Sequence, residues 1–296
     1  MPEEFEIVGV CAESPADHET FGRRACYEGL RWMSQEEILN YPGLDAVAVE
    51  TEMTELVPTA MRCAERGLPM HMDKPGGENL EEFDKLLDLC RKNHVILQMA
   101  YMFRGNPAIQ FCIEAARKGW FGQIFEVYTS MSRGRDSQPF RQWLSTYRGG
   151  GIFDFGSHLV DILISMLGAP DRIVSFQQQL DADGLNDNGH AILLYPKTIA
   201  TIQTALQQAD GQRSRRLFVS GTNATFELCP LEQGYIAYPK FNDTPLSARF
   251  FLKEGNESFA AGEHMLTFGP MRDRYIDQLE DFAAYLRGEK QNPYTL

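Results

Sequence analysis

Short apolar runs alternate with stretches of helical periodicity over the first hundred residues. The runs suit buried strands and comprise residues 5–11, 46–49, 68–72 and 95–99. Between them, apolar residues recur at three- and four-residue spacing, and Gly67 stands where the second such stretch should end. Strands that alternate with helices of this length predict βαβ units and a parallel sheet.

Polar residues mark where two of these helices should begin. Thr54 is placed to be an N-cap, and a helix is also expected after Ser14. Asn79 precedes an apolar stripe that is formed by Leu80, Phe83, Leu86, Leu87 and Cys90. The sequence therefore predicts that Asn79 caps a helix whose Leu80 side faces the core.

Beyond Asn106 the pattern changes. Helices are expected at residues 108–118, 156–167 and 271–286. Strands are expected at residues 124–131, 172–179, 190–194, 199–206, 217–220 and 224–228. Turn residues separate most of these strands, which favours a large and mostly antiparallel sheet with one open face.

Composition and charge narrow the possible functions. Hydrophobic residues make up 43% of the 296 residues, and the formal net charge is −13. Nucleic-acid binding needs clustered Lys and Arg, so an acidic chain disfavours it. The N-terminus has neither the basic nor the apolar segment of a leader, and no run is long enough for a membrane helix. We expect a cytoplasmic protein that binds neither nucleic acid nor membrane.

The six cysteines are widely scattered and form no C-x-x-C pair. This spacing is typical of reduced thiols in an intracellular protein and gives no support for a disulfide framework. It gives no support for zinc binding either, so we expect no metal site.

The segment at residues 149–161 places candidate chemical groups on one helical face. On a helix that begins near Asp154, the side chains of Asp154, His158 and Asp161 are neighbours. An imidazole can accept a hydroxyl proton, and a carboxylate can orient it; the glycines before Asp154 would let backbone approach a ligand. The competing interpretation is that Asp154 caps the helix and His158 is a core histidine.

Two other segments carry candidate groups at strand ends. Lys74 follows a strand of the parallel half, where it can donate to a substrate oxygen or simply be a surface lysine. Tyr101 and Arg104 follow the last strand of that half, and Arg104 can bind an anionic or hydroxyl-rich ligand or pair with an acidic residue.

Together these segments resemble the signature of the Gfo/Idh/MocA family of NAD(P)-dependent oxidoreductases, over nearly the whole chain. The family's Glu-Lys-Pro at the end of a Rossmann strand is similar to Asp73-Lys74-Pro75. Its glycine-rich segment with an aspartate and a histidine resembles residues 149–161, and its Tyr-x-x-Arg-x-Asn-Pro resembles residues 101–107.

The resemblance implies a role for each candidate. Lys74 would be the catalytic lysine, His158 the general acid and base, and Asp154 their substrate-facing partner. Tyr101 and Arg104 would line the substrate pocket together with Asp154 and His158. Residues implied at the cofactor are Thr51, Asp73, Lys74 and Glu13.

The resemblance also implies a fold. We expect an α/β protein in which an incomplete Rossmann-type parallel sheet domain, residues 1–105, binds NAD(P). An α+β domain, residues 106–296, would follow with the substrate site and a large, mostly antiparallel open sheet. Family members associate through that sheet, so a homodimer or homotetramer is expected.

Three departures from the family pattern bear on the cofactor. No G-x-G-x-x-G occurs, and residues 5–11 resemble the family's second strand, so we expect the first strand, glycine loop and first helix to be missing, and a last helix after Leu296 as well. We expect a truncated sequence; the alternative is a natural short form that no longer turns over substrate. Thr51 is followed by Glu52, where the family has proline. Ala12 precedes Glu13 at the ribose position and no basic residue follows closely, which favours NAD slightly over NADP.

The expected activity is hydride transfer between a nicotinamide cofactor and a sugar, cyclitol or related polyol. Two alternatives stay open: an NAD-dependent glycosidase of the same family, and a non-catalytic sugar-binding or scaffold protein on the same fold. Specificity should depend on residues 132–147, where Arg135, Arg141 and Trp143 either bind sugar hydroxyls or pack.

Overall fold

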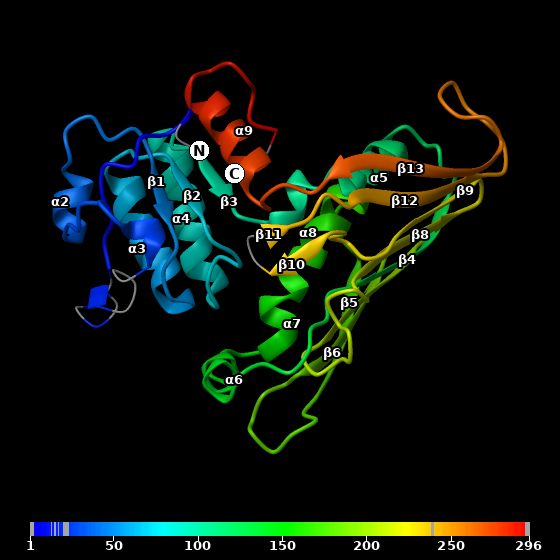
Figure 1. Cartoon of the computed structure of the whole chain (residues 1–296), viewed down its shortest axis with the longest axis horizontal. Helices are drawn as coiled ribbons and strands as arrows, with labels where there is room; N and C mark the ends of the chain where they lie inside the picture. Colours follow the sequence, from blue (N-terminus) through cyan, green and yellow to red (C-terminus); the bar gives the residue numbers. More distant parts are fainter. Residues whose placement is uncertain are drawn as a thin grey trace. The chain divides into compact units, whose positions relative to one another are not determined.

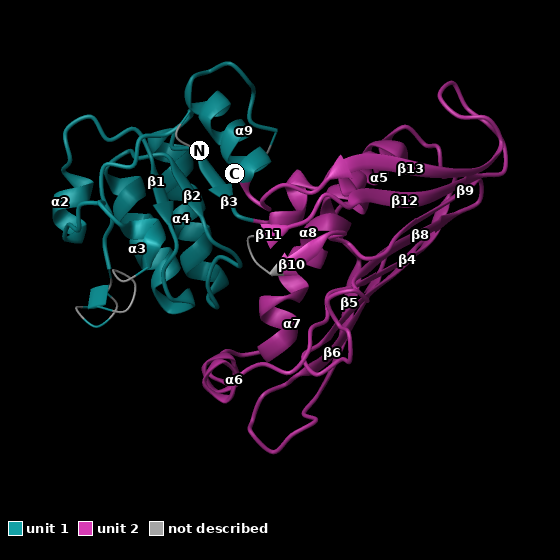
Figure 2. Ribbon diagram, in the orientation of Figure 1, with its two compact units in different colours: residues 1–100, 276–296 teal, residues 101–275 magenta. Residues whose placement is uncertain are grey.

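The computed structural model describes residues 3–12, 14, 16, 18–19, 24–237 and 240–293 (Figure 1). The chain forms two compact units (Figure 2). Unit 1 comprises Met1–Ala100 and Ile276–Leu296, and unit 2 comprises Tyr101–Tyr275. The last helix, α9 (Ile276–Leu286), therefore packs with the first part of the chain. The functional domain limits expected from the sequence, 1–105 and 106–296, stay a prediction.

Unit 1 contains a three-stranded parallel sheet in the order β1 (Val47–Val49), β2 (Met70–Met72), β3 (Leu97–Met99). The helices α3 (Met53–Glu65) and α4 (Leu80–Asn93) connect these strands and pack against each other, and α3 also contacts β1 and β2. Their apolar stripes supply the core, in which Leu56, Ala60 and Leu86 are fully buried. The parallel, Rossmann-like sheet that the alternating pattern predicts is confirmed.

The helix ends of unit 1 test the capping predictions. The Asn79 side chain accepts the backbone N–H groups of Glu81 and Glu82 at 3.0 and 3.4 Å, as expected. Gly67 follows α3 with φ +70°, which suits a glycine after a helix. Thr54 is not the N-cap, because the first turn of α3 already closes on the carbonyl of Glu52. Leu80 is 73% exposed, because it is the first residue of α4 and precedes the packed stripe.

Residues 5–11 do not form the predicted strand. Val10 donates to the carbonyl of Arg31 and accepts from Met33, each at 2.9 Å, and forms one isolated parallel bridge with Trp32. None of residues 5–11 is buried, so this run has one bridge in place of a ladder. Next come the short helices η1 (Ala25–Tyr27) and α2 (Gln35–Leu39). The helix expected after Ser14 lies largely outside the described residues.

Unit 2 is built on an eight-stranded sheet in the order β13-β12-β9-β8-β4-β7-β6-β5 (Figure 1). Its strands are β4 (Ile124–Ser130), β5 (Arg172–Gln178), β6 (Asn188–Leu194), β7 (Ile199–Ala205), β8 (Arg216–Gly221), β9 (Ala224–Leu228), β12 (Pro245–Leu252) and β13 (Gly262–Pro270). Neighbours are antiparallel except β4 and β7. The predicted large and mostly antiparallel sheet is confirmed; β12 and β13 were not predicted.

Helices cover one face of this sheet. α8 (Gly156–Leu167) contacts β4 and β7, and α5 (Pro107–Arg117) contacts β12. Along β6 and β9 buried residues alternate with partly exposed ones, as expected where only one face is covered. A small hairpin of β10 (Tyr235–Ala237) and β11 (Lys240–Phe241) stands apart from the main sheet. Among the described helices, none combines the length and apolar character needed to cross a bilayer.

Candidate functional site

The carboxyl ends of the unit 1 strands carry the residues predicted at the cofactor. The amide of Asp73 donates to the carbonyl of Val49 at 2.9 Å, which continues the β1–β2 pairing past the strands. The Asp73 carboxylate accepts the amide of Lys74 at 2.8 Å, and the Lys74–Pro75 peptide bond is cis. The Thr51 hydroxyl donates to the carbonyl of Glu52 at 3.1 Å. Glu13 lies outside the described residues.

This edge of the sheet is negatively charged. The pKa of Glu50 is raised, first because its carboxyl loses part of its hydration and second because Asp73 is negative. Carboxylates accept hydrogen bonds from hydroxyl and amide groups, so Glu50 and Asp73 offer acceptors for ribose hydroxyls at an edge that also carries the cation Lys74.

In unit 2, His158 is held between aromatic rings. It lies on α8, is 3% exposed, and faces the edges of Tyr101 and Phe103, with ring centroids 6.1 and 5.9 Å away. Both rings belong to the segment of the 3-10 helix η2 (Met102–Gly105), which Tyr101 precedes. These two ring contacts hold the imidazole of His158 in place within unit 2. Burial alone suits a core histidine as well as a catalytic one.

Arg104, which the sequence offered as a ligand-binding residue, is bound to Asp161. Its Nη2 and Nε donate to the two carboxylate oxygens at 2.7 and 3.0 Å. The side chains are only 16% and 10% exposed, and the guanidinium also lies over the Tyr101 ring at 5.0 Å. Because Asp161 follows His158 by one helical turn, this ion pair ties the η2 segment to the histidine's own helix.

Asp154 does not cap α8. It is the last residue of a separate helix, α7 (Gly150–Asp154), and Phe155 occupies the N-cap position of α8 without a side-chain bond. Asp154 is 8% exposed, and its carbonyl accepts the hydroxyl of Ser157 at 3.0 Å. The capping interpretation of Asp154 is therefore wrong, and the buried carboxylate lies at the α7–α8 junction, four residues before His158.

The glycines before Asp154 permit a close approach to protein backbone. The amide of Gly151 donates to the carbonyl of Asn186 at 3.0 Å. Gly150 has φ +49°, and a Cβ there would lie 2.8 Å from the same carbonyl oxygen. The β5–β6 turn therefore supports α7, and the expectation that these glycines let backbone approach a ligand stays a prediction.

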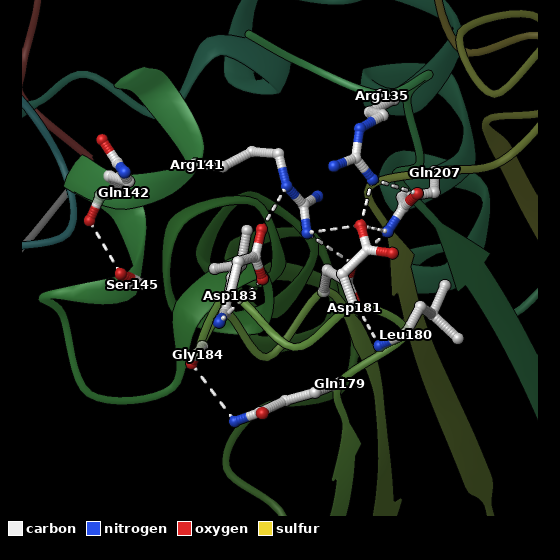
Figure 3. A network of polar contacts seen from close by, with 12 residues as sticks. Arg135, Arg141, Gln142, Ser145, Gln179, Leu180, Asp181, Asp183, Gly184 and Gln207 are labelled. Carbon is white, nitrogen blue, oxygen red and sulfur yellow. Dashed lines mark hydrogen bonds and ion pairs between the residues drawn. The ribbon is translucent and has the colours of Figure 1, made fainter. Parts of the chain in front are cut away.

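Residues 132–147 contain an arginine that is almost entirely buried. Arg141, on α6 (Gln138–Ser145), is 1% exposed and donates to Asp183 at 2.7 Å (Figure 3). It also donates to Asp187 at 3.0 Å. Gln207 donates to Asp187 at 2.6 Å and to Asp181, which also binds Arg135. The pKa of Arg141 is raised, because these aspartates outweigh the effect of burial. Both arginines are therefore engaged by carboxylates of the β5–β6 turn.

Trp143, on the same helix, packs against neighbouring aromatic rings, which is one of the two roles expected for it. Its ring centroid lies 5.4 Å from that of Phe140 and 5.1 Å from that of Tyr147.

Asp136 is a further charged residue of this segment that no sequence motif singles out. It pairs with Arg133, whose guanidinium lies over the ring of Phe155 at 5.5 Å, next to Asp154. Burial raises the pKa of Asp136, Arg133 and Arg141 oppose that shift, and the negative charge of Asp154 adds to it. Residues 132–147 thus contact the α7–α8 junction. No local pattern in the sequence marks Asp136, because Asp154 and Phe155 lie much further along the chain.

Comparison with protein families settles the relationship. Residues 1–101 match the model of an oxidoreductase family with an NAD-binding Rossmann fold, and residues 109–227 match the GFO/IDH/MocA C-terminal domain. The chain belongs to the Gfo/Idh/MocA family of oxidoreductases. The first match covers the parallel sheet of unit 1, and the second match covers the strands β4 to β8 of the eight-stranded sheet.

Individual relatives include dehydrogenases. The uncharacterized oxidoreductase ORF334 of Rhizobium meliloti is 24% identical over 271 residues, which are 90% of this chain and 77% of that protein. D-xylose 1-dehydrogenase (NADP(+)) 2 of Haloferax volcanii is 24% identical over 254 residues, which are 84% and 72% of the two chains.

Among solved structures, the WlbA dehydrogenase of Bordetella pertussis in complex with NADH and UDP-GlcNAcA has a TM-score of 0.68 at 20% identity. The match covers 81% of this chain and 70% of that one. A likeness at this identity establishes the shared fold. For metals, the described ranges contain no group of three or more His, Cys, Asp or Glu side chains placed to hold an ion.

Proposed function

We propose that this Gfo/Idh/MocA protein is an NAD(P)-dependent dehydrogenase that oxidises or reduces a sugar, cyclitol or related polyol. The observation that carries the proposal is the burial of both Asp154 and His158 at the α7–α8 junction, where Tyr101 and Phe103 pack against the imidazole of His158. D-xylose dehydrogenase among the relatives, and the NADH and UDP-GlcNAcA in the WlbA complex, support this substrate class.

The proposed cofactor site is the carboxyl edge of β1, β2 and β3. Thr51, Asp73 and Lys74 would hold the nicotinamide and ribose groups, and Glu13 the adenosine ribose of NAD. When bound, the cofactor supplies the hydride acceptor or donor. The preference for NAD over NADP rests on Glu13 and on the lack of a nearby basic residue in the sequence.

His158 and Lys74 are the proposed catalytic residues. His158 accepts the proton of the substrate hydroxyl, and the Asp154 carboxylate orients the imidazole and stabilises its charged form. Lys74, in unit 1, can donate a hydrogen bond to a substrate oxygen, which favours deprotonation of that hydroxyl. Tyr101 and Arg104 form part of the wall of the substrate site. In the reductive direction His158 returns the proton.

Three further assignments belong to the same proposal. Residues 1–105 are the cofactor domain, and residues 106–296 the substrate domain. The open face of the eight-stranded sheet, where Phe176 is 58% and Met265 64% exposed, forms a dimer or tetramer interface. The protein works in the cytoplasm, in keeping with its six free cysteines.

The test is to incubate the purified protein with neutral sugars and cyclitols and with NAD or NADP. Turnover is measured as the formation of reduced cofactor. Replacing His158 by Ala should lower kcat by about 100-fold or more, because proton transfer by a positioned side chain contributes that much. His190→Ala, on β6, is the control for loss of a histidine and should change kcat less than about twofold. Equal activity of His158→Ala and the unchanged protein would refute the assignment.

The same preparation separates the two alternatives. A glycosidase that uses transient oxidation would cleave an aryl glycoside without net formation of NADH. A non-catalytic binding protein would show heat on titration with a sugar and none with NAD or NADP.

A further inference from the structure

The described part of unit 2 contains a cavity of about 590 Å³ at the β10–β11 hairpin. Its lining residues come from residues 210–213, from residues 229–236 and from Thr244. Because β8 and β9 are antiparallel and Leu217 pairs with Leu228, the turn before β8 and the segment after β9 leave the sheet side by side. The volume is in the usual range of small-molecule sites, about 300–1,000 Å³. None of the lining residues is assigned above to the cofactor or the substrate.

Arg213 gives the wall of this cavity an exposed cation. In the ranges that the structure describes, no carboxylate forms an ion pair with its guanidinium. The neighbouring Arg215, by contrast, is 4% exposed and donates to Glu232 at 3.0 Å. Arginine binds a carboxylate or a phosphate group through two parallel hydrogen bonds. Arg213 is therefore available to an anionic ligand, whereas Arg215 is already engaged.

Glu232 also lines the cavity, but its carboxylate already has three donor side chains. It is 3% exposed and accepts from Arg215 at 3.0 Å, from Arg274 at 2.5 and 2.9 Å, and from Gln212 at 3.2 Å. Two guanidinium groups thus share one carboxylate. The wall therefore has a local excess of positive charge, although the formal net charge of the chain is −13. Such an excess favours an anion.

Asp210 places a carboxylate in the same wall. It lies three residues before Arg213, in the turn between β7 and β8, and has a φ of +53°. Among the described side chains, these two form no ion pair with each other. A carboxylate accepts a hydrogen bond from a hydroxyl group. A ligand that carries an anionic group and a hydroxyl can therefore bind at two points, and Pro230 and Tyr235 supply apolar surface beside them.

We propose that this cavity is a second small-molecule site and that it binds a hydroxylated organic anion, either a sugar phosphate or a sugar acid. Arg213 binds the phosphate or carboxylate group, and Asp210 accepts from a hydroxyl. The inference goes beyond the proposed function, because it concerns a different set of residues and requires neither the cofactor nor turnover.

Titration calorimetry without a nicotinamide cofactor tests the ligand class. The probes are D-glucose 6-phosphate, D-gluconate, inorganic phosphate and D-glucose. At least one of the two hydroxylated anions should bind about tenfold more tightly than inorganic phosphate or glucose, because only such an anion makes both contacts. The tighter of the two anions shows whether the ligand is a phosphate ester or a carboxylate. Binding of both anions no tighter than that of glucose overturns the proposal.

Arg213→Gln tests the contact with the anion. The side chain is exposed and has no carboxylate partner in the described ranges, so the variant should keep the fold. It should bind the preferred anion at least about tenfold more weakly. Arg117→Gln, on the exposed last turn of α5, is the matched control: it removes the same charge outside the cavity and should change the affinity less than about twofold. Equal losses in the two variants overturn the role of Arg213.

Asp210→Asn tests the contact with the hydroxyl. Asparagine suits the positive φ of this position. Loss of the charge should lower the preference for the hydroxylated anion over inorganic phosphate about fivefold. An unchanged preference overturns the role of Asp210.

Cys229 reports where the anion binds. It lines the cavity, and its thiol lies 3.7 Å from the carbonyl oxygen of Arg213. The preferred anion should slow the alkylation of Cys229 by iodoacetamide, measured by peptide mass spectrometry, and leave the exposed Cys26 of unit 1 unaffected. A lack of protection at a saturating concentration of the anion overturns the site. None of these measurements involves turnover, so the inference and the proposed function fail independently.

Discussion

The candidate residues of the two units are held in place in different ways. In unit 1, Thr51, Asp73 and Lys74 follow strands of three residues each, and backbone pairing sets their positions. In unit 2, His158 and Asp154 are buried, and side-chain ion pairs join the surrounding segments. The positions in unit 1 therefore depend on strand geometry, whereas those in unit 2 depend on buried ion pairs.

This difference has a consequence for stability. Breaking an exposed ion pair costs little, whereas removing one partner of a buried pair leaves an uncompensated charge. Unit 2 should therefore be far more sensitive than unit 1 to the loss of single polar side chains. Two comparisons between the units test this, and two predictions within single units follow them, in order of decreasing expected effect.

The largest effect is expected from Arg141→Met. The change leaves Asp187, which is fully buried, without its cation and should lower the free energy of unfolding of unit 2 by about 3–5 kcal/mol. The counterpart in unit 1 is Arg91→Met, which breaks an exposed pair with Asp88 and should cost about 0.5 kcal/mol or less. Urea unfolding, together with hydrogen exchange assigned to each unit, measures the loss of unfolding free energy in both variants. Equal losses in the two variants would contradict the expected difference between the units.

A smaller effect is expected from two asparagines that cap helices. Asn106 caps α5 and also donates to the carbonyl of Leu231 at 2.8 Å, with 2% exposure. Asn106→Ala should cost about 1 kcal/mol for the cap and about 1–3 kcal/mol more for the unpaired buried carbonyl. Asn79→Ala in α4 should cost about 1 kcal/mol, as a cap alone. Thermal unfolding of the two variants should therefore differ, and identical shifts would contradict the account.

Alanine substitutions at two glycines of unit 2 distinguish the cost of steric crowding from the cost of backbone strain. Gly150 and Gly168 both have positive φ, but only at Gly150 would a Cβ meet the Asn186 carbonyl oxygen, at 2.8 Å; at Gly168 nothing lies within 4 Å. Gly150→Ala should therefore cost about 1–3 kcal/mol more than Gly168→Ala. Calorimetric unfolding of both proteins checks this. A smaller cost at Gly150 would mean that the β5–β6 turn does not support α7.

The smallest expected effect is a loss of stability of unit 1 at acidic pH. His71, on β2, is partly withdrawn from water, which lowers its pKa from the ordinary value of 6.5, and a bond to Gln98 at 2.8 Å opposes the shift only in part. The unfolded state then binds a proton more readily than the folded state, so stability falls as the pH drops below about 6.5 and levels off below the folded pKa. Denaturation of the protein and of His71→Gln across pH 7 to 5 measures it; the variant should lack this slope.

The sequence predicts features that depend on neighbouring residues. Asn79 was identified as a helix cap and Gly67 as a helix end, because both depend on groups within a few residues. The parallel sheet and the open antiparallel sheet were predicted from the spacing of apolar runs. Residues 5–11 fit that pattern but pair only at Val10, since a ladder needs a partner strand that periodicity does not reveal.

The candidate site was less predictable where its partners are far apart in the chain. Asp161 was known to share a face with His158, but its pairing with Arg104 joins residues 57 positions apart. Arg141 binds aspartates more than 40 positions away, and Arg133, the neighbour that pairs with Asp136, lies over the ring of the distant Phe155. The sequence likewise does not show that the β5–β6 turn lies against Gly150 and Gly151.

The most direct test of the account is transfer of hydrogen from the substrate carbon to the nicotinamide. The protein is incubated with NAD and a neutral sugar deuterated at the oxidised carbon, and the reduced cofactor is analysed by mass spectrometry. The account predicts deuterium on the nicotinamide ring, and none with His158→Ala. Product that forms without deuterated cofactor would contradict the assignment of this chain as a dehydrogenase.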